Sequence, residues 1–100
     1  MSACQFTPQA VSDLFKIWNY IASDNPATAD RVEDAVFRAC DLLADAPFAG
    51  SVRPDLTALP VRFWVVRPYP NYLIVYNPST KPLQIIRILH AARNLPAILI

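Results

Sequence analysis

The sequence predicts an α+β fold in which a helical hairpin packs on one face of a small antiparallel β-sheet, with residues 3–7 as an added edge strand. Two observations lead to this prediction. Apolar residues recur with the period of a helix up to about residue 45, and with the two-residue period of a strand from about residue 61. The strand-like segments are also joined by short connections. Such connections link antiparallel neighbours, whereas a parallel crossover needs roughly a dozen residues or more.

The first helix is predicted to begin at Pro8, because Thr7 is a suitable N-cap and proline is favoured at the first helical position. Its core stripe, spaced i, i+3, i+4 and i+7, consists of Leu14, Ile17, Trp18 and Ile21. Trp18 and Tyr20 are both expected to pack in the core or within the hairpin. The opposite side, expected to face solvent, carries Asp13, Lys16 and Asn19.

The second helix is predicted to follow Asn25 as N-cap, with Pro26 in its first turn. Its apolar stripe consists of Ala29, Val32, Val36, Ala39 and Leu43. Its other face carries the charged residues Asp30, Arg31, Glu33, Asp34, Arg38, Asp41 and Asp45. Most of the acidic side chains are therefore expected on the solvent side of the hairpin.

Residues 46–59 are predicted to form the one long loop, because they combine prolines with the only glycine of the chain, Gly50. After this loop the sequence becomes rich in β-branched and aromatic residues, separated by short turns that contain proline and asparagine. Strands are predicted at residues 61–66, 72–76 and 83–89.

Side chains alternate between the two faces of a strand, which assigns residues to faces. On the last strand, Ile86 and Ile88 are expected to pack under the hairpin, which puts Ile85, Arg87 and Leu89 on the other face. Arg62, Trp64 and Val66 share one face of the first strand after the loop. One sheet face is therefore expected to present cations beside aromatic and aliphatic side chains: Arg62, Trp64 and Arg87, with some of Tyr72, Tyr76 and Leu89.

The net charge of +1 conceals a strong asymmetry between the two halves of the chain. Residues 1–50 hold three basic and seven acidic side chains, whereas residues 51–100 hold six basic and one acidic. Hydrophobic residues reach 54% and charged residues only 17%, with a mean hydropathy of +0.25. So much apolar surface on a small domain indicates a patch that a partner chain covers.

The length of 100 residues predicts a single domain, 1–100. No apolar run approaches the roughly 18 residues that a membrane span needs, so we expect a cytoplasmic protein without membrane contact. Cys4 and Cys40 stand far apart and the chain has one histidine, so neither a zinc site nor a disulfide framework is indicated. We expect two buried thiols, no metal and no cofactor.

Six segments carry motifs that are individually weak but specific in their order and spacing. They are residues 13–22, 25–29, 43–50, 71–76, 86–93 and 95–97. Together they resemble the ParE branch of the ParE/RelE toxins of bacterial toxin-antitoxin systems, over the length of the chain. Two positions depart from the family pattern: Ala91 stands where the family often has glycine, and Asn94 where it often has aspartate. The end of the last strand is expected to differ accordingly.

The resemblance implies a small toxin that acts in growth inhibition and plasmid stabilization. A cognate antitoxin would neutralise it in a hetero-oligomer, by laying an extended segment over apolar grooves. ParE toxins with an assigned target inhibit DNA gyrase by binding it, so the resemblance implies a non-enzymatic toxin without direct nucleic-acid contact. A toxin remnant that only binds antitoxin is an alternative.

The RelE branch of the same fold cleaves mRNA on the ribosome, which is the second alternative. That reaction needs proton transfer to and from oxygen, together with cations that stabilise the transition state. Arg62, Arg87 and Arg93 are suitable cations. For proton transfer the second half offers only His90 and Asp55, because tyrosines have pKa values near 10 and are poor bases. No residue is therefore assigned a catalytic role.

The residues expected to contact antitoxin or target are Arg62, Trp64, Tyr72, Tyr76, Arg87, His90 and Arg93. Two of them also have structural interpretations: His90 closing its strand by a hydrogen bond to nearby backbone, and Arg87 pairing with a carboxylate. The apolar segment 95–100 either folds back on the core or awaits a partner.

Overall fold

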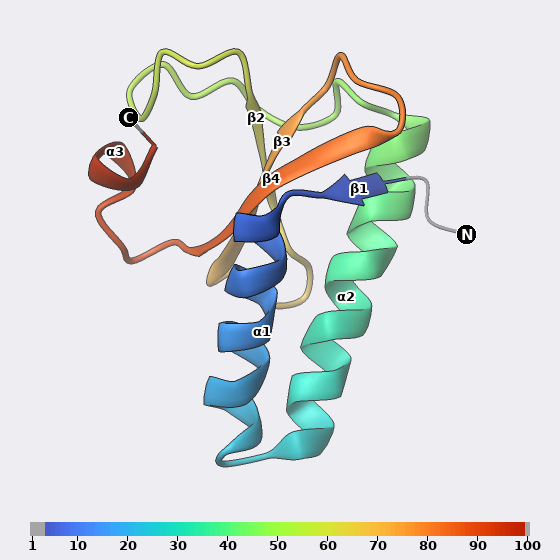
Figure 1. Ribbon diagram of the computed structural model, residues 1–100, viewed down its shortest axis with the longest axis vertical. Helices are drawn as coiled ribbons and strands as arrows, with labels where there is room; N and C mark the ends of the chain where they lie inside the picture. Colours follow the sequence, from blue (N-terminus) through green and yellow to red (C-terminus); the bar gives the residue numbers. More distant parts are fainter. Residues whose placement is uncertain (1–3, 100) are drawn as a thin grey trace.

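The computed structural model describes residues 4–99, in which two long helices lie side by side against a four-stranded sheet (Figure 1). The elements in chain order are β1 (Cys4–Phe6), α1 (Pro8–Ala22), α2 (Pro26–Asp45), β2 (Arg62–Val65), β3 (Tyr72–Asn77), β4 (Leu83–His90) and α3 (Leu95–Ile98). The predicted α+β fold and the position of each predicted helix and strand are confirmed.

The strand order is β1-β4-β3-β2, and the last three strands in the chain form the predicted antiparallel meander. The N-terminal edge strand is also confirmed, although residue 3 of the predicted range lies outside the described residues. β1 pairs with β4 in parallel, so the sheet is mixed. A parallel neighbour is reachable because the whole hairpin and the meander separate β1 from β4 in sequence.

Both long helices begin as predicted. The Thr7 hydroxyl accepts a hydrogen bond from the Ala10 N–H at 3.1 Å, and the Asn25 side chain accepts one from the Thr28 N–H at 3.1 Å. Each cap satisfies a backbone donor that has no partner within the helix, and each is followed by proline. The caps therefore fix where the two arms of the hairpin start.

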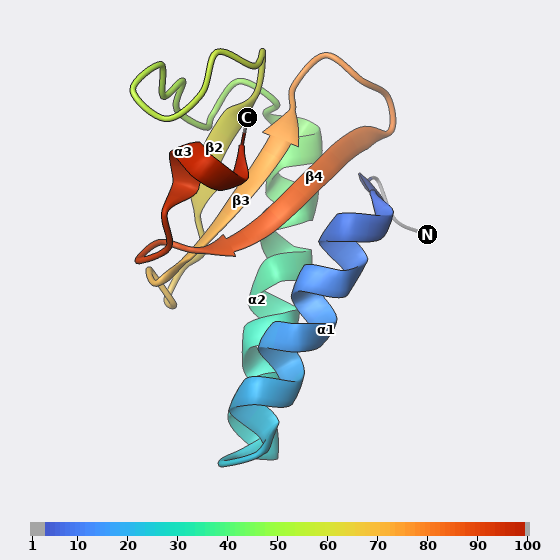
Figure 2. The same ribbon diagram turned by 60° about the vertical axis from the view of Figure 1, so that its left-hand side comes forward.

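Apolar clusters lie on both faces of the sheet. The larger one lies between the hairpin and the sheet and includes Leu14, Val36, Leu43, Ile74 and Tyr76. The smaller one lies on the opposite face, where α3 and the loop before β2 cover the strands (Figure 2). Its members are Val61, Phe63, Leu73, Val75, Leu89, Leu95 and Leu99. The apolar C-terminal segment thus folds back on the core as far as residue 99.

The predicted faces of β4 are wrong at Ile85 and Ile86. The ladder between β3 and β4 shifts register, so that Val75 pairs with Arg87 while Tyr76 pairs with Ile85. Ile86 is the extra residue of this β-bulge and packs with the smaller cluster, whereas Ile85 is fully buried under the hairpin. One extra residue reverses the alternation of side chains on that side of the bulge.

The predicted open sheet face is also wrong. Arg62, Trp64 and Val66 do share a face, but it is the face under the hairpin, and Tyr72 and Tyr76 join them there. Leu89 lies on the opposite face. The physical reason is that both sheet faces carry apolar side chains, so alternation alone does not say which face the helices cover.

Candidate functional site

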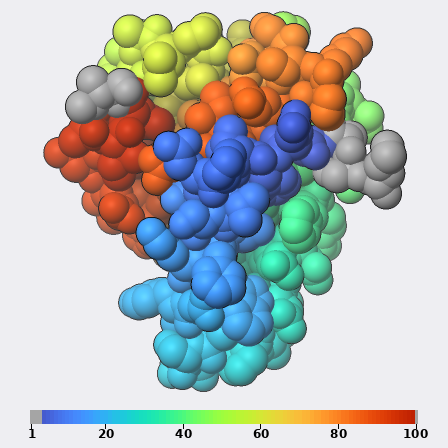
Figure 3. Space-filling model, in the orientation of Figure 1, coloured from blue at the N-terminus to red at the C-terminus, as the bar shows by residue number. Residues whose placement is uncertain are grey.

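An apolar groove runs along the outer side of the hairpin, between α1, α2 and the end of β1. It has a volume of about 330 Å³. We call it the hairpin groove, and its lining consists of Phe6, Val11, Leu14, Phe15, Trp18, Glu33 and Phe37. In the space-filling view, side chains of α1 project from this side of the molecule (Figure 3).

Large apolar side chains of the hairpin groove are open to solvent. Phe15 is 67% exposed, Val11 55% and Phe37 44%. Three such side chains side by side on a small protein are typical of a surface that a partner covers. The groove is therefore the strongest candidate for a protein-binding site.

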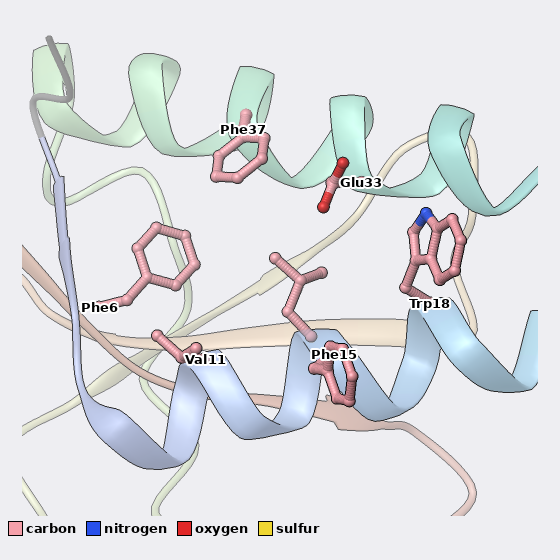
Figure 4. Close-up of a pocket in the computed structure, with 7 residues that line it drawn as sticks. Phe6, Val11, Phe15, Trp18, Glu33 and Phe37 are labelled. Atoms are coloured by element: carbon pink, nitrogen blue, oxygen red, sulfur yellow. The ribbon is translucent and has the colours of Figure 1, made fainter.

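Each side of the groove is held in place by contacts across the hairpin. The Trp18 indole N–H donates to the Asp30 carboxylate at 3.0 Å, which ties α1 to α2. The Phe6 and Phe37 rings meet edge to face with centroids 5.9 Å apart, which ties β1 to α2. Figure 4 shows Val11, Phe15 and Trp18 on the α1 side of the groove and Phe37 and Glu33 on the α2 side.

Arg87, predicted as a contact residue, pairs with a carboxylate of the chain itself. Its guanidinium donates to both oxygens of Asp13, at 2.7 and 3.0 Å, and the Ile88 N–H donates to the same carboxylate at 3.1 Å. These bonds to Asp13 raise the pKa of Arg87. Asp13 was predicted on the solvent side, but its side chain is only 12% exposed. The pair joins α1 to β4.

Arg62 and Tyr76 fasten the loop before β2 to the sheet. The Arg62 guanidinium donates to the Gly50 carbonyl at 2.8 Å and lies 5.1 Å from the centre of the Phe48 ring. The Tyr76 hydroxyl accepts from the Gly50 N–H at 2.8 Å and donates to the Pro47 carbonyl at 2.7 Å. Tyr76 is fully buried, so it offers no atom to a partner in this structure.

His90 and Tyr72 meet at the end of the sheet, with ring centroids 5.4 Å apart in an edge-to-face arrangement. The His90 Nδ1 accepts a hydrogen bond from the Ala92 N–H at 3.1 Å, which confirms the predicted contact with nearby backbone. This bond uses the Nδ1 lone pair, so Nε2 carries the hydrogen of the neutral ring.

Arg93 is exposed just beyond β4, as expected. It lines a hollow of about 360 Å³ together with Arg53, Val65, Asn94 and other residues, which we call the sheet-end hollow. Arg53 there forms a bidentate pair with Asp55 at 3.0 and 2.7 Å.

The structure does not gather the seven predicted contact residues into one surface. It brings together Tyr72 and His90, leaves Arg93 nearby in the chain, and places Trp64 half-buried against α2. Trp18 bonds to α2 within the hairpin but is only half-buried, at the edge of the hairpin groove, and the expected packing of Tyr20 is wrong, since it is 79% exposed. Cys4 and Cys40 are both buried, as predicted.

The sequence reasoning missed the hairpin groove. A signal was present, because Val11 and Phe15 lie four residues apart and outside the predicted core stripe of their helix, and Phe37 lies outside the stripe of the next. Large apolar residues off the buried stripe mark a second apolar face on a helix.

Comparisons with known proteins identify relatives of this chain. The family model described as "ParE toxin of type II toxin-antitoxin system, parDE" matches residues 4–95. A solved structure titled "Chromosomal ParDE TA system from P. aeruginosa" is similar, with a TM-score of 0.69 and 23% sequence identity. The match covers 90% of this chain and 96% of that chain. No curated protein gave a significant match.

Among residues 4–99, no helix is long and apolar enough to cross a membrane.

Proposed function

Because this chain belongs to the ParE toxin family of type II toxin-antitoxin systems, we propose that a cognate antitoxin neutralises it in a hetero-oligomer and that it stops growth by binding DNA gyrase. Both partners are proteins, and no cofactor takes part.

The hairpin groove is the observation that supports an antitoxin partner most directly. Its exposed Val11, Phe15 and Phe37 form a continuous apolar surface in the free chain. An amphipathic or extended segment laid along it removes this surface from water, which is the main driving force of protein association. The groove is therefore our proposed antitoxin site.

Three features favour binding over RNA cleavage. Arg87 is engaged by Asp13 and Arg62 by the Gly50 carbonyl, so neither guanidinium is free to stabilise a phosphoryl transition state. The Nδ1 lone pair of His90 is already used. The sheet face away from the hairpin is filled by the smaller apolar cluster and α3.

The target contact is proposed at the end of the sheet, where His90 and Arg93 meet solvent. Arg93 is a suitable contact because its guanidinium is exposed and beside the sheet-end hollow. Charged residues at the edge of a contact mainly affect association and specificity. Arg93→Glu should therefore weaken the action on gyrase without unfolding the protein.

The test combines two assays on the purified toxin. It should inhibit gyrase supercoiling, the protein encoded by the neighbouring reading frame should reverse this inhibition, and ribosome-bound mRNA should stay intact. Arg93→Glu should inhibit less, while Arg31→Glu, an equal charge change on exposed α2, should inhibit as the wild type does.

Ribosome-dependent mRNA cleavage that is lost in His90→Ala would overturn the proposal in favour of a RelE-like ribonuclease. Unaffected growth after induction without antitoxin would instead indicate a toxin remnant.

A further inference from the structure

The hairpin groove contains one charged residue among its apolar lining. Six of its seven lining side chains are aromatic or aliphatic, and the seventh is Glu33, which is partly buried. Figure 4 shows the Glu33 carboxylate between the rings of Phe37 and Trp18. Within residues 4–99 no side chain pairs with Glu33, and the Trp18 N–H is already taken by Asp30.

The Glu33 carboxylate restricts which protein segments can bind in the hairpin groove. In the free protein, water solvates it. A segment that covers Val11, Phe15 and Phe37 displaces this water, and an ionised carboxylate left without a partner in an apolar contact is strongly unfavourable. A well-fitting partner must therefore bring a cation to Glu33.

We propose that Glu33 selects the cognate antitoxin, whose groove-binding segment carries a lysine or arginine opposite Glu33, flanked by apolar residues. This inference rests on the proposed function, and it adds the specificity determinant. A buried ion pair contributes little net affinity, but a mismatched partner leaves a charge unpaired, so Glu33 acts chiefly by rejecting wrong antitoxins.

The groove also limits the shape of this segment. Its α1 side runs from Val11 to Trp18, which is roughly 10 Å at 1.5 Å per residue. Two turns of a partner helix cover that length, with apolar residues at i, i+3 or i+4, and i+7, and the cation between them.

A second copy of this chain fits the groove less well. In a twofold contact the same surface meets itself, so a second Glu33 would enter the same apolar space. Two carboxylates brought together there repel each other, and neither gains a cation. Charge complementarity therefore favours a basic, amphipathic partner.

The test measures binding of the full toxin to the protein encoded by the neighbouring reading frame, by calorimetry. Glu33→Lys should weaken binding on the order of 30-fold or more, because it sets two cations against each other in an apolar contact. Each lysine and arginine in the C-terminal half of the partner is then changed to glutamate. One of these changes should weaken binding to wild-type toxin and restore binding to Glu33→Lys.

Asp34→Lys is the matched control. It makes the same charge change at the next residue of α2, which is exposed and does not line the groove. Its affinity should stay within about fivefold of wild type, as for a surface charge. Thermal unfolding of both variants checks that the fold is retained.

The outcomes separate the two proposals. Tight binding that Glu33→Lys changes by less than about fivefold, or the failure of every charge reversal to restore binding, overturns the role of Glu33 alone. If the wild-type toxin does not bind this partner at all, the proposed function fails with it.

Discussion

At the scale of single residues, Tyr76 connects the sheet to the long loop. Its ring is fully buried under the hairpin, while its hydroxyl bonds to backbone groups of Pro47 and Gly50. Burial raises the pKa of this hydroxyl. A Cβ added at Gly50 would lie 2.5 Å from the same oxygen, which explains a glycine at this position without any special backbone angle. This buried side chain thus holds the loop together with Arg62.

Tyr76→Phe should lower the free energy of unfolding by about 1–3 kcal/mol, because the Gly50 N–H and the Pro47 carbonyl lose their buried partner. The ring itself is kept, so no cavity forms. Chemical denaturation of the wild type and the variant measures this difference.

Tyr20→Phe is the control, since Tyr20 is 79% exposed and should be neutral. Equal losses in the two variants would contradict the role of the Tyr76 hydroxyl.

The kind of interaction that a side chain makes could be predicted from the sequence more easily than the residue with which it makes it. A strand-end histidine that bonds backbone and an arginine that needs a carboxylate were both expected, and both occur. That the carboxylate is Asp13 could not be predicted, because the pair joins residues 74 positions apart. Asp13 also sits beside the core stripe, where a small rotation of the helix decides between solvent and sheet.

At the scale of elements, helices and strands followed from periodicity and caps to within a few residues. The β-bulge at Ile86 did not, because nothing in a run of β-branched residues marks the one that loses its partner. The same limit explains the misassigned sheet face. Both faces of these strands are apolar, so alternation groups the residues of a face but does not say which face the helices cover.

The short helix α3 is held by packing rather than by helix propensity. It has four residues and lacks a side-chain cap, yet Leu95 and the following Leu99 are buried against β3 and β4 side chains. The Leu99 carbonyl also accepts from the Thr57 hydroxyl at 3.1 Å. A segment this short has no independent stability.

Leu95→Ala should therefore destabilise the protein by about 2–4 kcal/mol, since it removes a large apolar side chain from a closed cluster. Hydrogen exchange should also become faster at residues 95–99. Thermal unfolding and exchange measurements test this.

Pro96→Ala is the comparison, because Pro96 is exposed beside Leu95. If Leu95→Ala left the exchange of this segment unchanged, the packing account of α3 would be wrong.

At the scale of the whole molecule, apolar surface remains outside the two clusters. The exposed Val11, Phe15 and Phe37 are part of the hydrophobic fraction of 54% that the interior does not use, as are exposed side chains elsewhere such as Phe48 and Val52. The composition predicted an apolar patch but could not locate it, because its residues fall on the outer side of two helices whose inner stripes already account for the core.

The free toxin should consequently be less soluble than its complex, and Phe15→Gln should raise the solubility of the free toxin. Saturating concentration and light scattering of the lone chain measure both effects. Val52→Gln makes a similar change at a side chain that is 57% exposed in the loop, outside the hairpin groove. Equal gains from both variants would mean that general polarity, and not the groove, limits solubility.

The parallel pairing of β1 with β4 has a consequence for synthesis of the chain. The first described strand finds its neighbour only in residues 83–85, and the Thr7 hydroxyl donates to the Ile86 carbonyl at 2.7 Å. Contacts between such distant parts form late, after much of the chain has left the ribosome. A nascent chain interrupted before β4 is synthesised would contain both long helices but would lack the strand against which α1 and β1 pack. Premature termination should therefore yield unfolded fragments that proteases degrade and that do not inhibit growth.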